Sequence, residues 1–223
     1  EYPDGSSKVD TYDSALIRSS ILSGGGATIS SQEYSYDSDR RLVSVTDGRT
    51  GETSYSYNLD DTIASITLPG NRKAQFFYDK KGQVVRTVLP DGSEQHVAYT
   101  ASGLVSGTWG SQQYPVGYEY DPQGRMLTQT TWQQYNPATG KGTGSPAVTR
   151  WEYDPATGYV LRKVDAKGKA ISYTYTPEGY LSKRTWARGV SATYSYDSIG
   201  RVSDIDYSDT TPDVAFSYTR AGQ

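Results

Sequence analysis

Aspartate recurs along this chain at intervals that could bring carboxylates together. Asp37, Asp79, Asp121 and Asp197 each follow a tyrosine, and matching tyrosines mostly recur every 21 or 22 residues. A glycosidase needs two carboxyl groups about 5–10 Å apart around its sugar substrate, and neighbouring repeats could supply such a pair. Each of these aspartates also stands where a turn begins, and aspartate is a strong turn former. A structural role therefore explains the aspartates more simply than catalysis does.

Other residues with catalytic potential are few. The chain has one histidine, His96, and no cysteine, so a His-activated nucleophile, a thiolate metal site and a disulfide scaffold all lack the residues they require. The run Asp37-Ser38-Asp39 begins like an EF-hand loop but lacks its glycine and terminal glutamate. Phosphate-loop and dinucleotide-binding glycine motifs are also missing. The sequence predicts no enzyme, no metal site and no cofactor.

The aspartates belong to a repeat centred on a tyrosine, which we define as position zero. Position zero is occupied by Tyr36, Tyr57, Tyr78, Tyr99, Tyr120, Tyr153, Tyr175, Tyr196 and Tyr218. The longest step between them is 33 residues, from Tyr120 to Tyr153. Two residues before position zero stands another large apolar residue, and the residue between is usually small or polar, which is the alternation of a half-buried strand. A fixed period of this kind indicates a repeat architecture.

The residues after position zero predict a tight hairpin, whose loop we call the proximal turn. Aspartate or asparagine occupies position one in six repeats, and position four is glycine in Gly82, Gly103, Gly124, Gly179, Gly200 and Gly222. This pattern is typical of a type I turn closed by a left-handed residue, a loop that places position zero opposite position six. Position six is aliphatic or methionine in seven repeats, and Val160 takes this place one residue later in the Tyr153 repeat. We call the turns at the opposite end, which connect one hairpin to the next, distal turns. We expect a positive φ to be required at proximal glycines such as Gly124 and Gly200 more than at a distal glycine such as Gly144.

Three runs carry a resemblance to a known family. YSYDSIGRV (194–202), YEYDPQGRM (118–126) and FYDKKGQVV (77–85) resemble the tyrosine–aspartate (YD) repeats of the RHS family, and the resemblance covers nearly the whole chain. It implies a long β-strip that winds into a hollow shell, as in bacterial RHS polymorphic toxins, the cocoon component of insecticidal toxin complexes and teneurins. Arg40 and Asp61 depart from the pattern by replacing the turn glycine. The family's core-end autocleavage signature is missing, so no cleavage chemistry is carried over.

The expected fold is all-β: tandem antiparallel β-hairpin repeats of about 21 residues that form a long curled β-strip. Eleven residues are predicted to have structural repeat roles: Tyr36, Asp37, Tyr78, Asp79, Gly82, Tyr120, Asp121, Gly124, Tyr196, Asp197 and Gly200.

We divide the chain into four segments. Residues 1–33 are a degenerate first repeat, in which Gly24, Gly25 and Gly26 form the distal loop, and residues 34–131 are regular YD repeats. Residues 132–150 are an insertion loop, and residues 151–223 are YD repeats that end in mid-unit. Both ends carry incomplete hairpins, so we expect a part of a longer array; a closed ring completed by the two ends is the alternative.

Charge and hydropathy limit the kinds of partner that the chain could bind. The formal net charge is −3 and the pI about 5.2, which argues against binding to nucleic acid or to a membrane surface. No apolar run approaches the roughly 18 residues of a membrane span. The resemblance implies a secreted or cell-surface location, with the rest of a parent YD-repeat chain or an encapsulated cargo domain as partner.

Two functions are consistent with this pattern. The first is a non-catalytic scaffold, a segment of a YD-repeat shell that encloses or displays a cargo such as a toxin domain. The alternative is an extracellular module that binds a glycan or a protein partner through the 132–150 loop and exposed aromatic residues. Because the repeat positions are committed to the fold, the candidate ligand-binding residues are those near distal turns: Trp109, Trp132, Tyr135 and Trp186. Packing of these tryptophans between strands is the simpler explanation of their positions.

Overall fold

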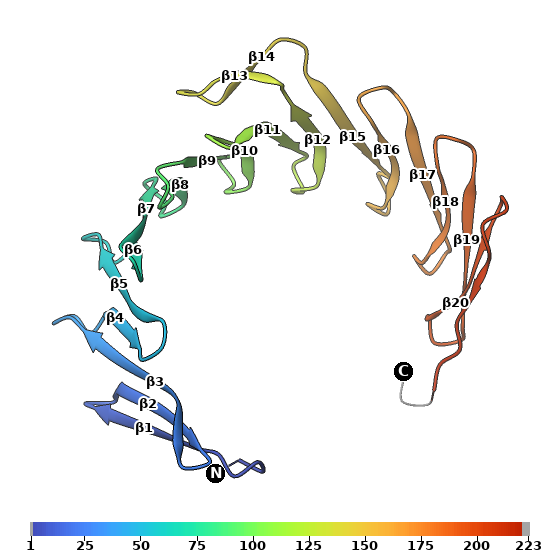
Figure 1. The fold of residues 1–223 in the computed structure, drawn as a ribbon. Coiled ribbons are helices and arrows are strands. Elements are labelled where there is room, and N and C mark those ends of the chain that lie inside the picture. The colour runs from blue at the N-terminus through green and yellow to red at the C-terminus, as the bar shows by residue number, and fades with distance from the viewer. Residues whose placement is uncertain (1, 220–223) are drawn as a thin grey trace. The chain divides into compact units, whose positions relative to one another are not determined.

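The computed structural model describes residues 2–219, which form strands and turns and contain no helix. This described part of the chain accordingly has no helix of the length and apolarity needed to cross a membrane. Its 21 strands are distributed over two compact units. The first unit runs to Ala98 and includes Thr108–Gln113, and the second consists of Tyr99–Gly107 and the chain from Tyr114 onward. The predicted all-β repeat fold is confirmed, and Figure 1 shows the successive hairpins of each unit.

The first unit is an antiparallel meander in which each strand pairs with the next. Its strands are β1 (Ser7–Asp13), β2 (Leu16–Gly24), β3 (Ala27–Tyr36), β4 (Leu42–Asp47), β5 (Gly51–Tyr57), β6 (Ile63–Leu68), β7 (Arg72–Tyr78), β8 (Val84–Val88) and, up to Ala98, β9 (Glu94–Tyr99).

The second unit continues the same pattern, and β12 pairs with β15 across the insertion. The strands β10 (Val105–Gly110) and β11 (Gln113–Tyr120) contribute residues to both units. The remaining strands are β12 (Met126–Thr131), β13 (Gln134–Asn136), β14 (Lys141–Thr143), β15 (Ala147–Tyr153), β16 (Val160–Val164), β17 (Ala170–Tyr175), β18 (Leu181–Thr185), β19 (Ser191–Tyr196), β20 (Val202–Tyr207) and β21 (Val214–Ala215).

The proximal turns have the predicted geometry. In the turn after Tyr120, the N–H of Asp121 donates to the carbonyl of Arg125, and the N–H of Gly124 donates to the carbonyl of Asp121, both at 2.9 Å. The register shifts just before Tyr120, so that this tyrosine faces Met126 at position six. A type I turn followed by a left-handed residue and a bulge gives this arrangement.

The same register recurs along the chain. Position zero faces position six in the pairs Tyr36–Leu42, Tyr57–Ile63, Tyr78–Val84, Tyr175–Leu181 and Tyr196–Val202, and Tyr153 faces Val160 across its longer turn. Arg40 and Asp61, which replace the turn glycine, keep the left-handed conformation with φ of 65° each. The turn therefore imposes its conformation even on residues that disfavour it. The predicted turn residue Gly222 lies outside the described residues.

The start of the chain is built differently. The strands β1, β2 and β3 are joined by two-residue loops, Ser14–Ala15 and Gly25–Gly26, and all four loop residues have positive φ. Two successive positive φ values define the type I′ hairpin, which matches the twist of long strands. The glycine loop was expected at this place.

Distal turns vary from repeat to repeat. Three of them, Leu89–Ser93, Asp165–Lys169 and Trp186–Val190, have the same two closing hydrogen bonds as the proximal turns, whereas Pro69–Asn71 is a three-residue loop. We expected a positive φ at proximal glycines more than at distal ones. This expectation is wrong for the distal Gly144, whose φ is 78°. A left-handed residue closes many tight turns, so both ends of the hairpins need glycine.

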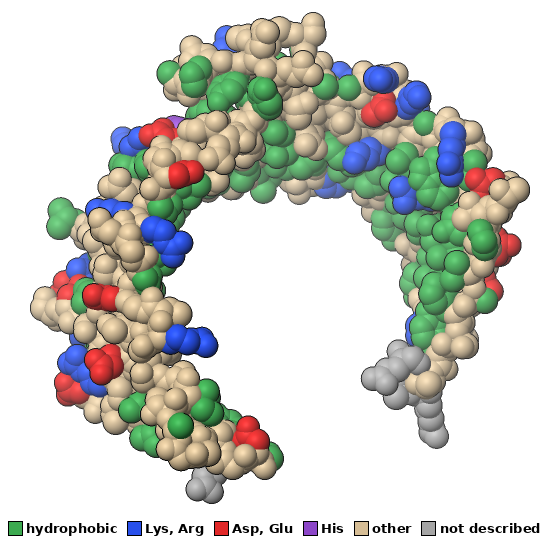
Figure 2. Space-filling model, viewed as in Figure 1, with side chains coloured by type: hydrophobic (Ala, Val, Ile, Leu, Met, Phe, Trp, Pro, Cys, Tyr) green, Lys and Arg blue, Asp and Glu red, His purple; other side chains and the backbone are tan. Residues whose placement is uncertain are grey.

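The strips of both units are one layer thick. The chain exposes 14816 Å², whereas a compact monomer of its 24.5 kDa mass would expose about 10,000 Å². Ala192 is the only fully buried hydrophobic residue within the described range. Position zero and the large residue before it lie on one side of the strip, here called the aromatic face, and the opposite side is called the polar face. Hydrophobic side chains gather on one face of β15 to β20 in Figure 2.

Candidate functional site

The carboxylates that follow position zero are fully engaged within their own turns. The Oδ1 atom of Asp121 accepts the N–H of Gln123 at 3.0 Å and that of Arg125 at 2.8 Å, while Oδ2 accepts the guanidinium Nε of Arg125 at 2.6 Å. Asp37 and Asp197 make the same contacts in their own repeats. An aspartate that holds a turn in this way is an acceptor in three hydrogen bonds and is poorly placed to act on a substrate.

The titration of these groups agrees with their contacts. The backbone N–H of Arg41, with help from its guanidinium, holds the pKa of Asp37 below its ordinary value, and Arg201 lowers the pKa of Asp197 in the same way. Burial raises the pKa of Asp121, but the N–H and guanidinium of Arg125 outweigh it and leave the pKa lowered. A glycosidase acid requires the opposite shift, toward a raised pKa.

Seven position-zero tyrosines reach back to the preceding repeat. The hydroxyl of Tyr120 donates to the carbonyl of Val105 at 2.8 Å, and Val105 is position six of that repeat. The same bond links Tyr57–Leu42, Tyr78–Ile63, Tyr153–Met126, Tyr175–Val160, Tyr196–Leu181 and Tyr218–Val202, at 2.7 to 3.0 Å. The tyrosine hydroxyl thus supplies a hydrogen-bond donor to the position-six carbonyl of the repeat before it. The Tyr153 bond spans the insertion, so the repeat contact is kept where the sequence period is broken.

Position five covers the ring of the next tyrosine. The guanidinium of Arg41 lies 4.8 Å from the centre of the Tyr57 ring, and that of Arg125 lies 4.7 Å from the centre of the Tyr153 ring. Tyr180 stacks on Tyr196 at 4.9 Å in the equivalent place. Cation–π and aromatic contacts of this kind stabilise by about 0.5–1.5 kcal/mol each.

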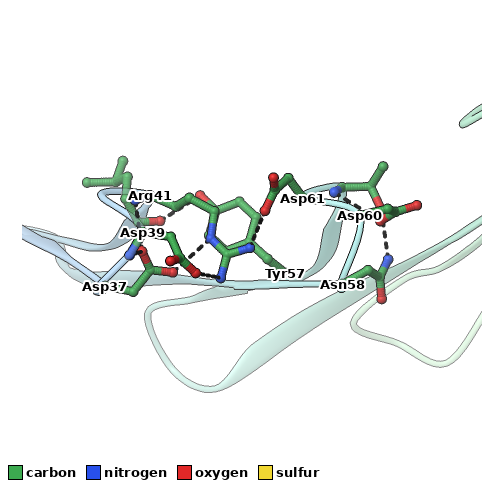
Figure 3. Close-up of polar contacts among 9 residues, drawn as sticks. Asp37, Asp39, Arg41, Tyr57, Asn58, Asp60 and Asp61 are labelled. Atoms are coloured by element: carbon green, nitrogen blue, oxygen red, sulfur yellow. Dashed lines mark hydrogen bonds and ion pairs between the residues drawn. The ribbon is translucent and has the colours of Figure 1, made fainter.

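Figure 3 shows the densest of these turns, where Arg41 lies among Asp37, Asp39 and Asp61 beside the Tyr57 ring. Sequence reasoning missed the role of position five. An available signal was the recurrence of arginine four residues after the turn aspartate, in Arg41, Arg125 and Arg201.

Three of the four predicted ligand-binding residues lie in the second unit, and each tryptophan has a neighbour over its ring. The ring of Trp132 lies against Gly117 of β11, 3.2 Å from the place a Cβ would take, and still closer to Gly142 of β14. Both glycines leave room for the indole, which fixes the insertion hairpin onto the strip. Tyr135 is partly buried within β13.

Trp186 begins a distal turn, and the guanidinium of Arg184 lies 4.7 Å from the centre of its ring. Among residues 2–219, no ring contact joins Trp132 to Trp186.

Trp109, in the first unit, is part of a cluster on the polar face. Its ring stacks on His96 at 5.1 Å with an interplanar angle of 7°. His96 Nε2 and Arg86 Nη1 each lie 2.9 Å from the Glu94 carboxylate, and Arg86 lies 3.8 Å from the centre of the Phe77 ring. The single histidine is thus part of a packed network that joins β7 to β10. Within residues 2–219, no group of three or more His, Cys, Asp or Glu residues could hold a metal ion.

Comparison with known proteins agrees with this geometry. The family model described as Teneurin YD-shell matches residues 11–131. The chain is similar to the crystal structure of TcdB2-TccC3 without hypervariable C-terminal region, with 18% identity and a TM-score of 0.52 over 96% of this chain and 15% of that one. It is also similar to the crystal structure of TcdB2-TccC3-Cdc42, with 17% identity and a TM-score of 0.50 over 96% and 15%.

The chain spans 15% of the length of each of these two structures, and similarity at this level of identity shows a common fold. No curated protein matches the sequence.

Proposed function

Because the chain belongs to the Teneurin YD-shell family, we propose that it is a non-catalytic segment of a YD-repeat shell that encloses or displays a cargo, such as a toxin domain, outside the cell. The observation that carries this proposal is the series of tyrosine–carbonyl bonds between repeats. These bonds hold successive hairpins together in a strip that has no second layer.

The single layer supports a wall function. A strip with one aromatic face exposes apolar surface that an isolated soluble protein rarely leaves open. In a shell, that face would line the interior or contact further parts of the parent chain. The partners implied are therefore the remaining YD repeats or an enclosed cargo domain.

The absence of catalysis is proposed on the same grounds. The repeated aspartates hold turns, and the tyrosine hydroxyls bind backbone carbonyls. The residues with the best catalytic potential thus have structural tasks that substitution would disturb.

Protease protection in the parent protein tests the shell function. The parent chain that contains this segment is purified, treated with trypsin, and the survival of its cargo domain is compared with that of the same domain produced alone. We expect the enclosed domain to survive at least tenfold longer, and to lose that protection after mild acid unfolding of the shell. Equal digestion of the enclosed and free domains would refute enclosure.

A second proposal is that the insertion binds a glycan or a protein partner. It is favoured by the separate two-stranded sheet of β13 and β14, which Trp132 fixes to the strip between Gly117 and Gly142. Glycan-array and pull-down binding would be compared between the intact chain and a variant in which residues 132–150 are replaced by the short turn LPDGSE. Binding that is unchanged by the replacement would exclude the insertion as the binding element.

A further inference from the structure

One position on the aromatic face changes chemical character in two consecutive repeats. The residue opposite the large apolar residue before position zero is Val45, Ile66, Thr87, Gln129 or Ile205 in five repeats. In the two repeats between Gln129 and Ile205 it is Lys163 and Arg184. Both belong to the second unit, on β16 and β18. Cations therefore replace aliphatic or uncharged residues at one structurally equivalent place.

Each of the two cations lies against a tryptophan. The ammonium of Lys163 is 5.0 Å from the centre of the Trp151 ring directly opposite it, and the guanidinium of Arg184 is 4.7 Å from that of Trp186. Tyr173 lies opposite Arg184 in the sheet. These contacts hold the two side chains over the aromatic face, where an aromatic ring strengthens the local preference for a cation.

Neither cation has an acidic partner in the described chain. Among residues 2–219, no ion pair involves Lys163 or Arg184. Two nearby cations at other positions of the repeat do have acidic partners: Arg162 pairs with Glu152 at 3.3 Å, and Arg188 pairs with Asp209 at 3.6 Å. The Nε atom of Arg184 is buried and has no hydrogen-bond partner. Because this buried atom is closed to a ligand, an anionic ligand is favoured instead by the two cationic head groups that lack an acidic partner.

We propose that the aromatic face of β15 to β18 binds an acidic polypeptide segment, whose carboxylates pair with Lys163 and Arg184. The two residues lie two strands apart, which is about 10 Å in a sheet, farther than one carboxylate can bridge. The occupant therefore carries at least two acidic side chains. Apolar residues between the carboxylates would pack on Tyr173 and on Ile171, which is opposite Lys163.

A polypeptide fits this site better than a nucleic acid does. Base stacking needs an open aromatic ring, and here Trp151 and Trp186 each already have a cation over the ring. The site rests on these contacts and not on the shell function proposed above, so its test does not depend on cargo enclosure.

The test uses the whole chain and a fluorescent ten-residue peptide of alternating glutamate and tyrosine, with binding followed by anisotropy. The double variant Lys163→Gln/Arg184→Gln removes two cations from the aromatic face. Its matched control, Arg162→Gln/Lys183→Gln, removes two cations from adjacent positions on the polar face and leaves the same net charge. Circular dichroism checks that both variants fold, and the exposed single variant Lys163→Gln provides a milder test if the double variant does not.

We expect the aromatic-face double variant to weaken binding at least tenfold, the single variant about threefold, and the polar-face control less than twofold. A peptide with glutamine in place of glutamate should bind at least tenfold more weakly than the acidic one. Equal losses in the two double variants, or equal binding of the glutamine peptide, would overturn the proposal. Tighter binding of a ten-nucleotide oligothymidine, with the same dependence on Lys163 and Arg184, would replace the acidic polypeptide with a nucleic acid and also overturn it.

Discussion

At the proximal end of the hairpins the same contacts recur from repeat to repeat, whereas the distal ends differ in length and sequence, and only some of them close with the same hydrogen bonds. A tyrosine hydroxyl donates a hydrogen bond to a carbonyl of the preceding repeat both at Tyr57 in the first unit and at Tyr196 in the second. The distal connections range from the two-residue loop Gly25–Gly26 to the insertion that carries β13 and β14.

The difference indicates where the fold is specified. Proximal contacts fix how each repeat meets the one before it, because the tyrosine bond and the position-five stack both cross the repeat boundary. Distal turns close only their own hairpin and can change length without disturbing that contact. The bond from Tyr153 to Met126 demonstrates this, since it is 2.8 Å long across the insertion.

The largest expected effect comes from crowding a proximal glycine. Gly200 and the distal Gly144 have similar φ values of 82° and 78°, but a Cβ on Gly200 would collide with the Tyr180 hydroxyl, whereas one on Gly144 would meet nothing within 4 Å. Gly200→Val should lower the free energy of unfolding by about 2–4 kcal/mol and Gly144→Val by about 1–2 kcal/mol. Urea denaturation measures both. Equal losses would show that crowding between repeats contributes nothing.

Removing one tyrosine hydroxyl should have a smaller effect. Tyr120→Phe leaves the Val105 carbonyl without its donor, so we expect a loss of about 1 kcal/mol. The control is Tyr114→Phe near a distal turn, where the side chain is 63% exposed, and its loss should be close to zero. If the two variants denature at the same urea concentration, the bonds between repeats do not stabilise the strip.

Alkaline pH should weaken the proximal ends that hold a buried tyrosine with a raised pKa. Burial raises the pKa of Tyr57, Tyr78, Tyr120, Tyr153 and Tyr175 above the ordinary value. A raised folded-state pKa contributes stability that is present below the unfolded-state value, about 10, and is lost as pH rises through the folded-state value. Unfolding free energies measured from pH 8 to 12 should therefore fall above about pH 10. Tyr120→Phe should show a shallower fall than the native chain, and an identical slope would contradict this assignment.

The smallest effect is expected from position five. Arg125→Lys keeps the charge but loses the Nε bond to Asp121 and the planar contact with Tyr153, because lysine has no planar fork. Its urea midpoint should fall by less than that of Tyr120→Phe. Arg162→Lys, in a solvent-exposed ion pair with Glu152, is the matched control and should change the midpoint still less. A larger fall in the urea midpoint for Arg162→Lys than for Arg125→Lys would contradict a stabilising role of position five at the proximal end.

The repeat and its register were predictable because they depend on residues close in sequence. A tyrosine, a turn aspartate and a glycine within five residues define the hairpin, and the pairing of Tyr120 with Met126 follows from loop length. The contacts between repeats were less accessible. They join a tyrosine of one hairpin to a carbonyl of the hairpin before it, as Tyr120 does with Val105, and the spacing within a single hairpin does not specify how two hairpins meet.

The tryptophans illustrate a second limit. Spacing places Trp132 near a distal turn, but its environment is set by Gly117 and Gly142, which meet the ring only after the insertion hairpin has folded back. The cation at Lys163 could have been noticed as a break in a series of uncharged residues. That Lys163 lies opposite Trp151 could be known only from the register of β15 and β16, which the extra turn residue shifts by one.

Hydrogen exchange at the turn amides tests the comparison most directly. We predict that the proximal amides of Gly124 and Arg125, which donate to the Asp121 carbonyl and carboxylate, exchange at least tenfold more slowly than the distal amides of Arg49 and Thr50, which donate only to the Asp47 carboxylate. The same order should hold at Gly200 and Arg201, and Tyr120→Phe should speed exchange around Val105 in the preceding repeat. Equal exchange at the Asp121 and Asp47 turns, with no effect of Tyr120→Phe on the preceding repeat, would contradict the account.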